Sequence, residues 1–236
     1  MRARRGATRG VMEGRKRRYL EAMGIPVWTL RHRMHPEDVG SSGEQGSIAR
    51  MDWSVLSEAV SVCTACELHR SRTHTVFGTG DVHAQWMVIG EAPGADEDRQ
   101  GEPFVGRAGR LLNAMLQAIG LRREQVYIAN ILKCRPPNNR DPRPEEVDCC
   151  EPFLHRQIQL VAPRVILAVG RIAAQNLLKT VTPIGRLRGQ RHHLPGSQIP
   201  VVVTYHPAYL LRSPQQKRRA WEDLCLARSV VEDSGG

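Results

Sequence analysis

A glycine-rich run with several acidic residues lies between an apolar segment and an amphipathic one. It reads Gly90-Glu-Ala-Pro-Gly-Ala-Asp-Glu-Asp98 and continues through Phe104 to Gly109. Glycines let the backbone approach a ligand closely, and amide groups ahead of a helix can face an anion. These residue types favour a loop that contacts a sugar phosphate, and a purely structural turn is the alternative. The ring of Phe104 can stack on a flat ligand or anchor the loop in the core.

Four cysteines give a second signal. Cys63 and Cys66 are separated by two residues, and Cys134 and Cys150 stand sixteen positions apart, each near prolines. Two close thiols and two distant ones describe a tetrathiolate site, for which zinc and an iron–sulfur cluster are both candidates. Spacing alone favours zinc, and it cannot separate Cys150 from its neighbour Cys149 as the fourth ligand. Disulfides are least favoured, because no apolar signal segment leads the chain and a reduced cytosol is the default.

The segments that must position these residues alternate in type along the chain. Apolar runs predict four strands, at 86–90, 126–132, 164–169 and 200–205. Apolar residues spaced by three and four over 111–119 predict a helix after the glycine-rich loop. The alternation predicts an α/β fold, a three-layer α/β/α sandwich around a mostly parallel four-stranded sheet. A ligand site is then expected at the carboxyl ends of the strands, and Cys225, on a terminal helix, is interpreted as a small core residue.

Four motifs together resemble the family 4 uracil-DNA glycosylases, the iron–sulfur type of bacteria and archaea. The motifs are the Gly90–Gly109 run, Asn130-Ile-Leu-Lys-Cys-Arg-Pro-Pro-Asn-Asn-Arg140, Cys150-Glu-Pro-Phe-Leu154 and His206-Pro-Ala-Tyr-Leu-Leu-Arg212. They occur in the family's order with its cysteine spacing, and the resemblance spans about 53–228. It implies a monofunctional DNA glycosylase of base-excision repair, which hydrolyses the N-glycosidic bond of uracil in single- and double-stranded DNA and leaves an abasic site.

The resemblance also implies a 4Fe-4S cluster held by four thiolates, those of Cys63, Cys66, Cys134 and Cys150. Cys150 is chosen over Cys149 because the family's fourth cysteine precedes the Pro-Phe-Leu segment by one residue. The cluster of that family is regarded as structural. The resemblance therefore reverses the preference for zinc that spacing alone supports.

Excision of uracil requires a hydrogen-bond donor for the base, because negative charge moves onto the base as the bond breaks. His206 directly follows the expected strand at 200–205 and is placed to be that donor, and a histidine bonded into a turn is the alternative. Asn130 directly follows the apolar residues 126–129 of another expected strand, and its amide can match the edge of uracil and mismatch cytosine. An asparagine that merely caps a strand is the alternative.

The resemblance further implies a set of substrate-pocket residues: Gly90, Glu91, Ala92, Gly94 and Phe104, the last as the stacking residue. Better-known uracil glycosylases carry an aspartate where this chain has Ala92, so the general base is absent from that position. The choice of a water-orienting residue among Glu91, Glu97 and Asp98 stays open, and leaving-group stabilisation needs only a weak base. Glu91 is the candidate catalytic carboxylate, and it is also a candidate to crowd the methyl group of thymine.

The segment after His206 is expected to contact DNA. Leu210 and Leu211, on a protruding loop, can fill the space left by a base that has flipped out of the duplex, and Arg212 can hold a phosphate. The alternative is that Tyr209, Leu210 and Leu211 form the first turn of the last helix and pack inward.

Charge predicts a polyanionic partner. The net charge is +10, and residues 1–50 contain 11 Lys or Arg against 5 Asp or Glu, or +6 of it. We therefore expect a basic, partly disordered extension with a flexible linker at 1–50. A contact with DNA or a repair partner and a solvated tail that contacts neither are the two alternatives for this extension. The catalytic domain is expected at 51–228 and a disordered tail at 229–236.

The absence of any apolar run near 18 residues predicts no membrane span, and we expect a cytoplasmic, nucleoid-associated monomer. Two rival functions remain. If Asn130 and His206 were only turn residues, the chain would be a non-catalytic nucleic-acid-binding module with an iron–sulfur or zinc site. A superfamily enzyme acting on another base is the second rival.

Overall fold

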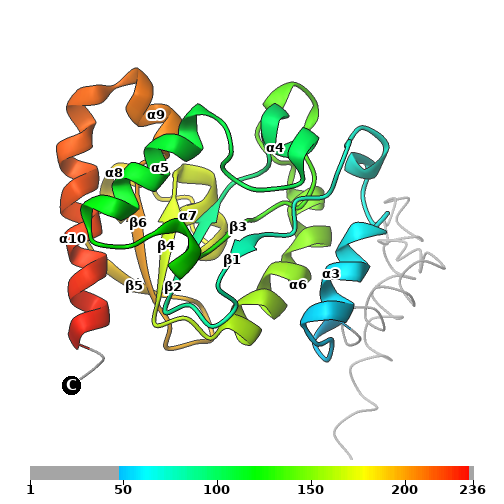
Figure 1. Ribbon diagram of the computed structural model, residues 1–236, viewed down its shortest axis with the longest axis horizontal. Helices are drawn as coiled ribbons and strands as arrows, with labels where there is room; N and C mark the ends of the chain where they lie inside the picture. The colour runs from blue at the N-terminus through cyan, green and yellow to red at the C-terminus, as the bar shows by residue number, and fades with distance from the viewer. Residues whose placement is uncertain (1–47, 234–236) are drawn as a thin grey trace, which may run out of the picture. The chain divides into compact units, whose positions relative to one another are not determined.

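The computed structural model describes residues 48–233, in which strands and helices alternate as expected (Figure 1). The strands are β1 (Thr79–Gly80), β2 (Trp86–Gly90), β3 (Tyr127–Asn130), β4 (Val165–Val169), β5 (Arg191–His193) and β6 (Pro200–Thr204). The longer helices are α3 (Trp53–Ser61), α5 (Arg107–Ala118), α6 (Pro144–Val161) and α10 (Lys217–Asp233). The shorter ones are α4 (Ala95–Gln100), α7 (Arg171–Leu177), α8 (Ile184–Leu187) and α9 (Pro207–Arg212). Residues 1–47 and 234–236, which hold most of the expected extension and the end of the expected tail, lie outside the described residues.

The strands form one sheet in the order β1-β3-β2-β4-β6-β5. The four inner strands are parallel and match the four expected segments, so the predicted mostly parallel sheet is confirmed. Every residue of these four strands is buried, which explains their continuous apolar sequence. The sheet has six strands rather than four, because β1 and β5 pair antiparallel at its two edges. Each edge strand has only two or three residues, too few for a pattern of alternation to be visible in sequence.

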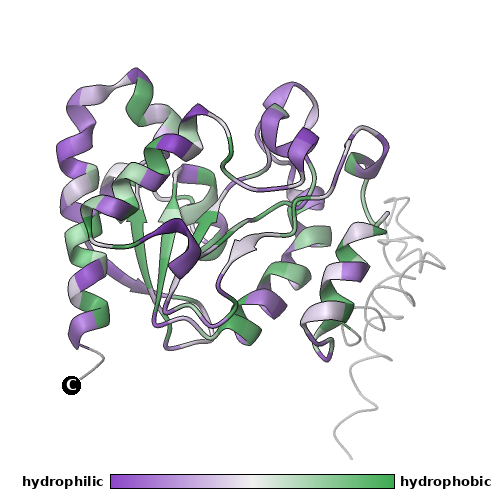
Figure 2. Cartoon of the chain, in the orientation of Figure 1, coloured by the Kyte–Doolittle hydropathy of each residue, from purple (hydrophilic) through white to green (hydrophobic). Residues whose placement is uncertain are grey.

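Helices cover both faces of the sheet, which confirms the three-layer α/β/α arrangement. On one face, Ile89, Ala129 and Ile166 pack with residues of α6, α7 and α8. On the other face, Val88 and Leu167 pack with residues of α5, α9 and α10. Figure 2 shows the apolar inner strands between helices whose colours alternate between apolar and polar. The carboxyl ends of the parallel strands therefore form one rim, between the two helical layers, from which loops can build a site.

The C-terminal helix differs in two ways from the expectation. It continues to Asp233, beyond the residue 229 at which a tail was expected, because Val230 is buried against the other apolar residues of its layer. Cys225 is exposed, so its assignment to the core is wrong. Leu224 and Ala227 take the inward positions of this turn of the helix. No helix among residues 48–233 is long and apolar enough to cross a membrane.

Candidate active site and four-cysteine pocket

A cleft of about 490 Å³ opens at the carboxyl rim of the parallel strands. Its lining combines the loop after β2, the end of β3, the segment before α6 and the start of α9. It includes most of the site residues expected from sequence, namely Glu91, Ala92, Gly94, Phe104, Asn130, His206 and Arg212. Gly90 lies beneath them, paired with Asn130 across β2 and β3. The structure thus brings together residues from three separated motifs.

Asn130 is buried, with 2% of its surface exposed, and its side-chain carbonyl has no hydrogen-bond partner among the described residues. A Cβ atom at Gly90 would lie 2.4 Å from that oxygen and 2.7 Å from Cζ of Phe104, so glycine is required for this packing. Buried acceptors are nearly always paired, because an unpaired one costs about 1–3 kcal/mol. The orphaned oxygen is therefore available to accept a hydrogen bond from a ligand in the cleft.

Phe104 is buried in the core layer shared with α5 and also lines the cleft, so it serves as both loop anchor and cleft wall. Its φ of 54° is in the left-handed region, which a bulky residue adopts only when its surroundings enforce it. Glu97 does so by accepting hydrogen bonds from the amides of Val105 (3.1 Å) and Gly106 (3.2 Å). Gly109 also permits the conformation, since a Cβ there would lie 1.7 Å from the carbonyl oxygen of Phe104.

His206 caps the N-terminus of α9, where its Nδ1 accepts a hydrogen bond from the amide of Ala208 (3.1 Å). The proton of the neutral ring therefore lies on Nε2. Burial lowers the pKa of His206 to about 4; the charge of Arg212 lowers it further and that of Glu97 opposes the shift. The ring centroid of His206 lies 5.7 Å from that of Phe104. At neutral pH this residue is an uncharged hydrogen-bond donor beside an aromatic ring.

The three carboxylates near the glycine-rich loop differ in their surroundings. Burial, followed by the negative charge of Asp141, raises the pKa of Glu91 to about 7, with Arg171 acting in the opposite direction. Glu97 is bonded to the loop amides, and the buried Asp98 accepts from the amide of Thr73 (2.9 Å). The pKa of Glu91 is suited to proton transfer near neutral pH, and Glu91 lines the cleft, as Glu97 also does.

The two leucines after His206 have different environments. Leu210 is 1% exposed and packs in the layer of α5 and α10, so the expectation that it protrudes toward DNA is wrong. It faces inward because α9 begins at Pro207 and gives the segment a helical period. Leu211 is 38% exposed, and its expected contact with DNA stays a prediction.

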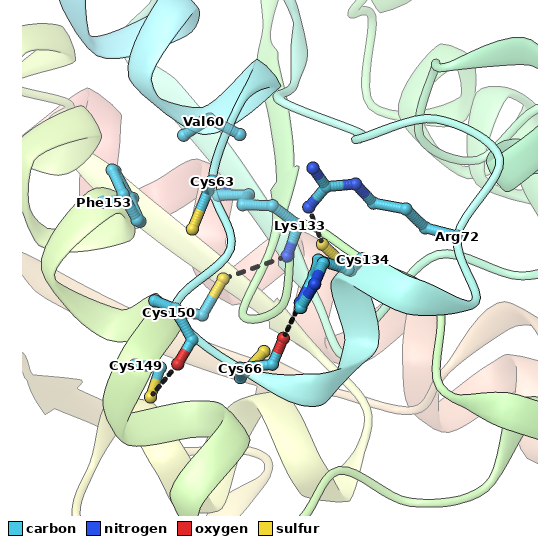
Figure 3. A pocket seen from close by; sticks show the side chains of 11 residues that line it. Val60, Cys63, Cys66, Arg72, Lys133, Cys134, Cys149, Cys150 and Phe153 are labelled. Carbon is cyan, nitrogen blue, oxygen red and sulfur yellow. Dashed lines mark hydrogen bonds between the residues drawn. The ribbon is translucent and has the colours of Figure 1, made fainter.

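A second pocket, away from the cleft, gathers the cysteines (Figure 3). Its lining contains five thiols, those of Cys63, Cys66, Cys134, Cys149 and Cys150. Arg72 donates to Sγ of Cys134 (3.1 Å), and the amide of Lys133 donates to Sγ of Cys150 (3.2 Å). The thiol of Cys149 instead donates to the carbonyl of Ala65 (3.4 Å). Two of the sulfurs are thus held as hydrogen-bond acceptors, the role that a metal-bound thiolate has.

Burial raises the pKa of the Cys150 thiol to about 12 and also raises that of Cys134. A thiolate at either position therefore requires a compensating positive charge, which a metal ion provides. As the side chains stand, residues 48–233 contain no group of three or more His, Cys, Asp or Glu side chains arranged to hold a metal ion. In chemical type, the thiols of this pocket fit an iron–sulfur cluster, which would bind four of the five.

Lys133 is a residue that sequence reasoning missed. It is 1% exposed, burial lowers its pKa to about 8, and its Nζ donates to the backbone carbonyl of Asn130 (2.9 Å). Lysine side chains are almost never fully buried, so the sequence gives no reason to expect a lysine in the interior beside Asn130. The apolar neighbours Ile131 and Leu132, both buried, were the available signal that the chain stays inside the protein beyond β3.

Comparisons with known proteins follow the same motifs. Residues 77–225 match the Uracil DNA glycosylase superfamily. The chain is 48% identical over 167 residues to the type-4 uracil-DNA glycosylase of Archaeoglobus fulgidus, which covers 68% of this chain and 84% of that protein. It is 45% identical over 185 residues to the type-4 enzyme of Thermotoga maritima, which covers 77% and 95%. The type-4 enzyme of Pyrobaculum aerophilum is 42% identical over 182 residues, covering 75% and 93%.

Proposed function

Because the chain belongs to the uracil-DNA glycosylase superfamily, we propose that it hydrolyses the N-glycosidic bond of uracil in DNA and leaves an abasic site. One observation carries this proposal beyond the family. The cleft holds an unpaired acceptor on Asn130, a neutral donor on His206 and the ring of Phe104, and an extracted base needs all three.

Recognition of uracil follows from the orphaned oxygen of Asn130. Uracil carries an N–H group between two carbonyls, so Oδ1 of Asn130 accepts from the N–H and its amide group donates to a carbonyl. Cytosine has an acceptor in place of the N–H, which would leave Oδ1 buried without a partner. The penalty for that mismatch favours uracil. The similarity to type-4 uracil-DNA glycosylases favours uracil over the rival specificities and over a purely binding role.

Departure of the base depends on His206. As the bond breaks, negative charge accumulates on the carbonyl oxygens of uracil, and Nε2–H of the neutral imidazole donates to one of them. The low pKa of His206 keeps the ring neutral at physiological pH, so the donor proton needs no prior change in protonation. Phe104 stacks on the flipped base and offsets part of the few kcal/mol that unstacking costs.

Glu91 is proposed to orient the attacking water. Its pKa of about 7 leaves a large fraction of the carboxyl ionised at neutral pH, as a weak general base requires. Ala92 offers no carboxylate, and Asp98 is turned away toward Thr73. Leu211 and Arg212, beyond His206, are proposed to contact the DNA on either side of the flipped nucleotide.

A 4Fe-4S cluster is proposed at the cysteine pocket, held by Cys63, Cys66, Cys134 and Cys150. Cys150 is preferred to Cys149 because its sulfur accepts a backbone hydrogen bond, whereas the thiol of Cys149 donates to Ala65. Bound there, the cluster supplies a covalent connection between the end of α3, the segment after β3 and α6. We also propose that the chain acts as a monomer on cytoplasmic, nucleoid DNA and that residues 1–50 contact DNA or a repair partner.

The test is excision from single-stranded and G·U-mispaired oligonucleotides, followed by alkali to cleave abasic sites. We expect cleavage by the parent protein and by His83→Ala, which changes an exposed histidine outside the cleft. His206→Ala should reduce kcat by about 100-fold or more, the usual cost of one lost transition-state donor. Absence of abasic sites from iron-loaded parent protein would refute the proposed function.

A further inference from the structure

Lys133 lacks an obvious counter-ion. Its side chain is 1% exposed, and no carboxylate among residues 48–233 lies within ion-pairing distance of it. The other lysines of the described part, Lys179 and Lys217, are not fully buried, and Lys179 pairs with Glu151. Burying an ammonium group away from water is costly unless a negative charge or several hydrogen bonds compensate.

Two contacts connect Lys133 to two different sites. Its Nζ donates to the backbone carbonyl of Asn130, at the floor of the cleft, over 2.9 Å. Its own amide donates to Sγ of Cys150 over 3.2 Å, and the residue lines the cysteine pocket next to Cys134 (Figure 3). One residue therefore lies between the base-reading asparagine and the thiols.

We propose that Lys133 is the counter-ion of the iron–sulfur cluster and the positioning residue for Asn130, so that base recognition depends on the charge held in the cysteine pocket. The inference rests on the proposed function, because it requires the cluster and the role of Asn130. Four thiolates around a 4Fe-4S core carry a net negative charge, the partner that the buried ammonium lacks. The hydrogen bond from Nζ to the backbone carbonyl of Asn130 holds that residue in place, and thereby fixes the position of its unpaired Oδ1.

The test compares Lys133→Met with the parent and with Lys217→Met, which removes an exposed lysine that lines neither the cleft nor the cysteine pocket. The first readout is loss of the visible cluster absorbance on addition of an iron chelator, together with the reduction potential of the cluster. We expect Lys133→Met to release iron about tenfold faster and to have a more negative potential, since a buried positive charge favours the reduced cluster. Lys217→Met should match the parent.

The second readout is kcat/KM for uracil in a double-mutant cycle with Asn130→Ala. We expect Lys133→Met to lower kcat/KM about tenfold in the parent background and less than about twofold in the Asn130→Ala background, because its effect passes through Asn130. A purely structural lysine would cause the same loss in both backgrounds. That result would overturn the positioning role.

Parental iron release and potential in Lys133→Met would overturn the counter-ion role. If Lys133→Met does not fold, Lys133→Gln, which keeps a polar head group without the charge, undergoes the same measurements with the same expectations. Failure of the proposed function is distinguishable, because it appears as a parent protein that holds iron but excises no uracil. The iron-release comparison then still tests the counter-ion role by itself.

Discussion

In the function proposed above, the unpaired Oδ1 of Asn130 is the group that selects the base. Two neighbouring polar groups are engaged within the protein, since Nδ1 of His206 accepts from the amide of Ala208 and Glu97 accepts from the loop of Phe104. The asparagine oxygen, by contrast, lacks a donor, and only certain bases carry one. The proposed selectivity at this residue therefore comes from a hydrogen-bond acceptor that the protein itself leaves unpaired.

Glu91 predicts the pH dependence of the reaction. Only the ionised carboxyl can accept a proton from water, so kcat/KM should rise as pH increases through about 7 and level off above it. The neutral His206 contributes no change in this range, because its pKa is about 4. Glu91→Gln should lower kcat/KM by between about tenfold and about 100-fold and abolish the rise.

The measurement is a pH–rate profile of both proteins, taken from about one and a half units below to about one and a half units above the pKa of Glu91, at saturating and limiting DNA. Asp96→Asn, a change of an acidic residue that pairs with Arg99 on α4, is the matched control and should keep the parental profile. A rise that persists in Glu91→Gln would show that another group activates the water.

At the scale of elements, the loop between α4 and α5 carries Phe104, and its geometry is fixed by contacts with Glu97 and Gly109. Gly109→Ala would place a methyl group 1.7 Å from the carbonyl oxygen of Phe104 and force the loop away from α5. We expect kcat/KM to fall at least about tenfold, because a displaced stacking ring misplaces the base. Gly185→Ala, at a position in α8 with open space around it, is the control and should stay within about twofold.

Thermal unfolding of both variants separates a loss of activity caused by the displaced loop from a loss caused by lower stability of the whole protein. Gly109→Ala should lose activity by more than its change in melting temperature explains. Parental activity in Gly109→Ala would mean that the loop can relax without moving the ring of Phe104.

Some elements and site residues were predictable because their signal is local. Continuous apolar runs marked the four parallel strands, and the carboxyl ends of parallel strands converge by geometry, so Asn130 and His206 could be placed in one site before any contact was known. The glycine-rich run likewise marked the loop that carries Phe104. The cysteine spacing marked the second pocket.

Other features depend on contacts between distant residues and left no local pattern. The bond from Lys133 to Asn130 requires a buried lysine, which statistics oppose. The division of Leu210 inward and Leu211 outward depends on where α9 starts, and an apolar pair alone does not reveal that. The edge strands β1 and β5 are recognisable only from their partners in the sheet.

At the scale of the whole molecule, charge is distributed unevenly. Residues 1–50 carry +6 of the net charge of +10. Deleting residues 1–47 should weaken DNA binding and reduce the slope of log K against log salt by roughly 2 or more, as lost phosphate contacts do. Excision at saturating DNA should be unchanged, because the cleft lies within residues 48–233. An unaltered salt slope, measured by fluorescence anisotropy, would show that these cations do not contact DNA.

The strand register has a consequence for the safety of the genome. Gly90 pairs with Asn130 across β2 and β3, and Val169 pairs with Thr204 across β4 and β6. A slip by one residue would shift a strand end by about 3.3 Å and turn its side chains to the opposite face, which would remove Asn130 or His206 from the cleft. With the roles proposed for Asn130 and His206, a wrongly assembled molecule would therefore excise no base, rather than excise bases without selectivity. Its fault would leave lesions in place but would not strip normal bases from DNA.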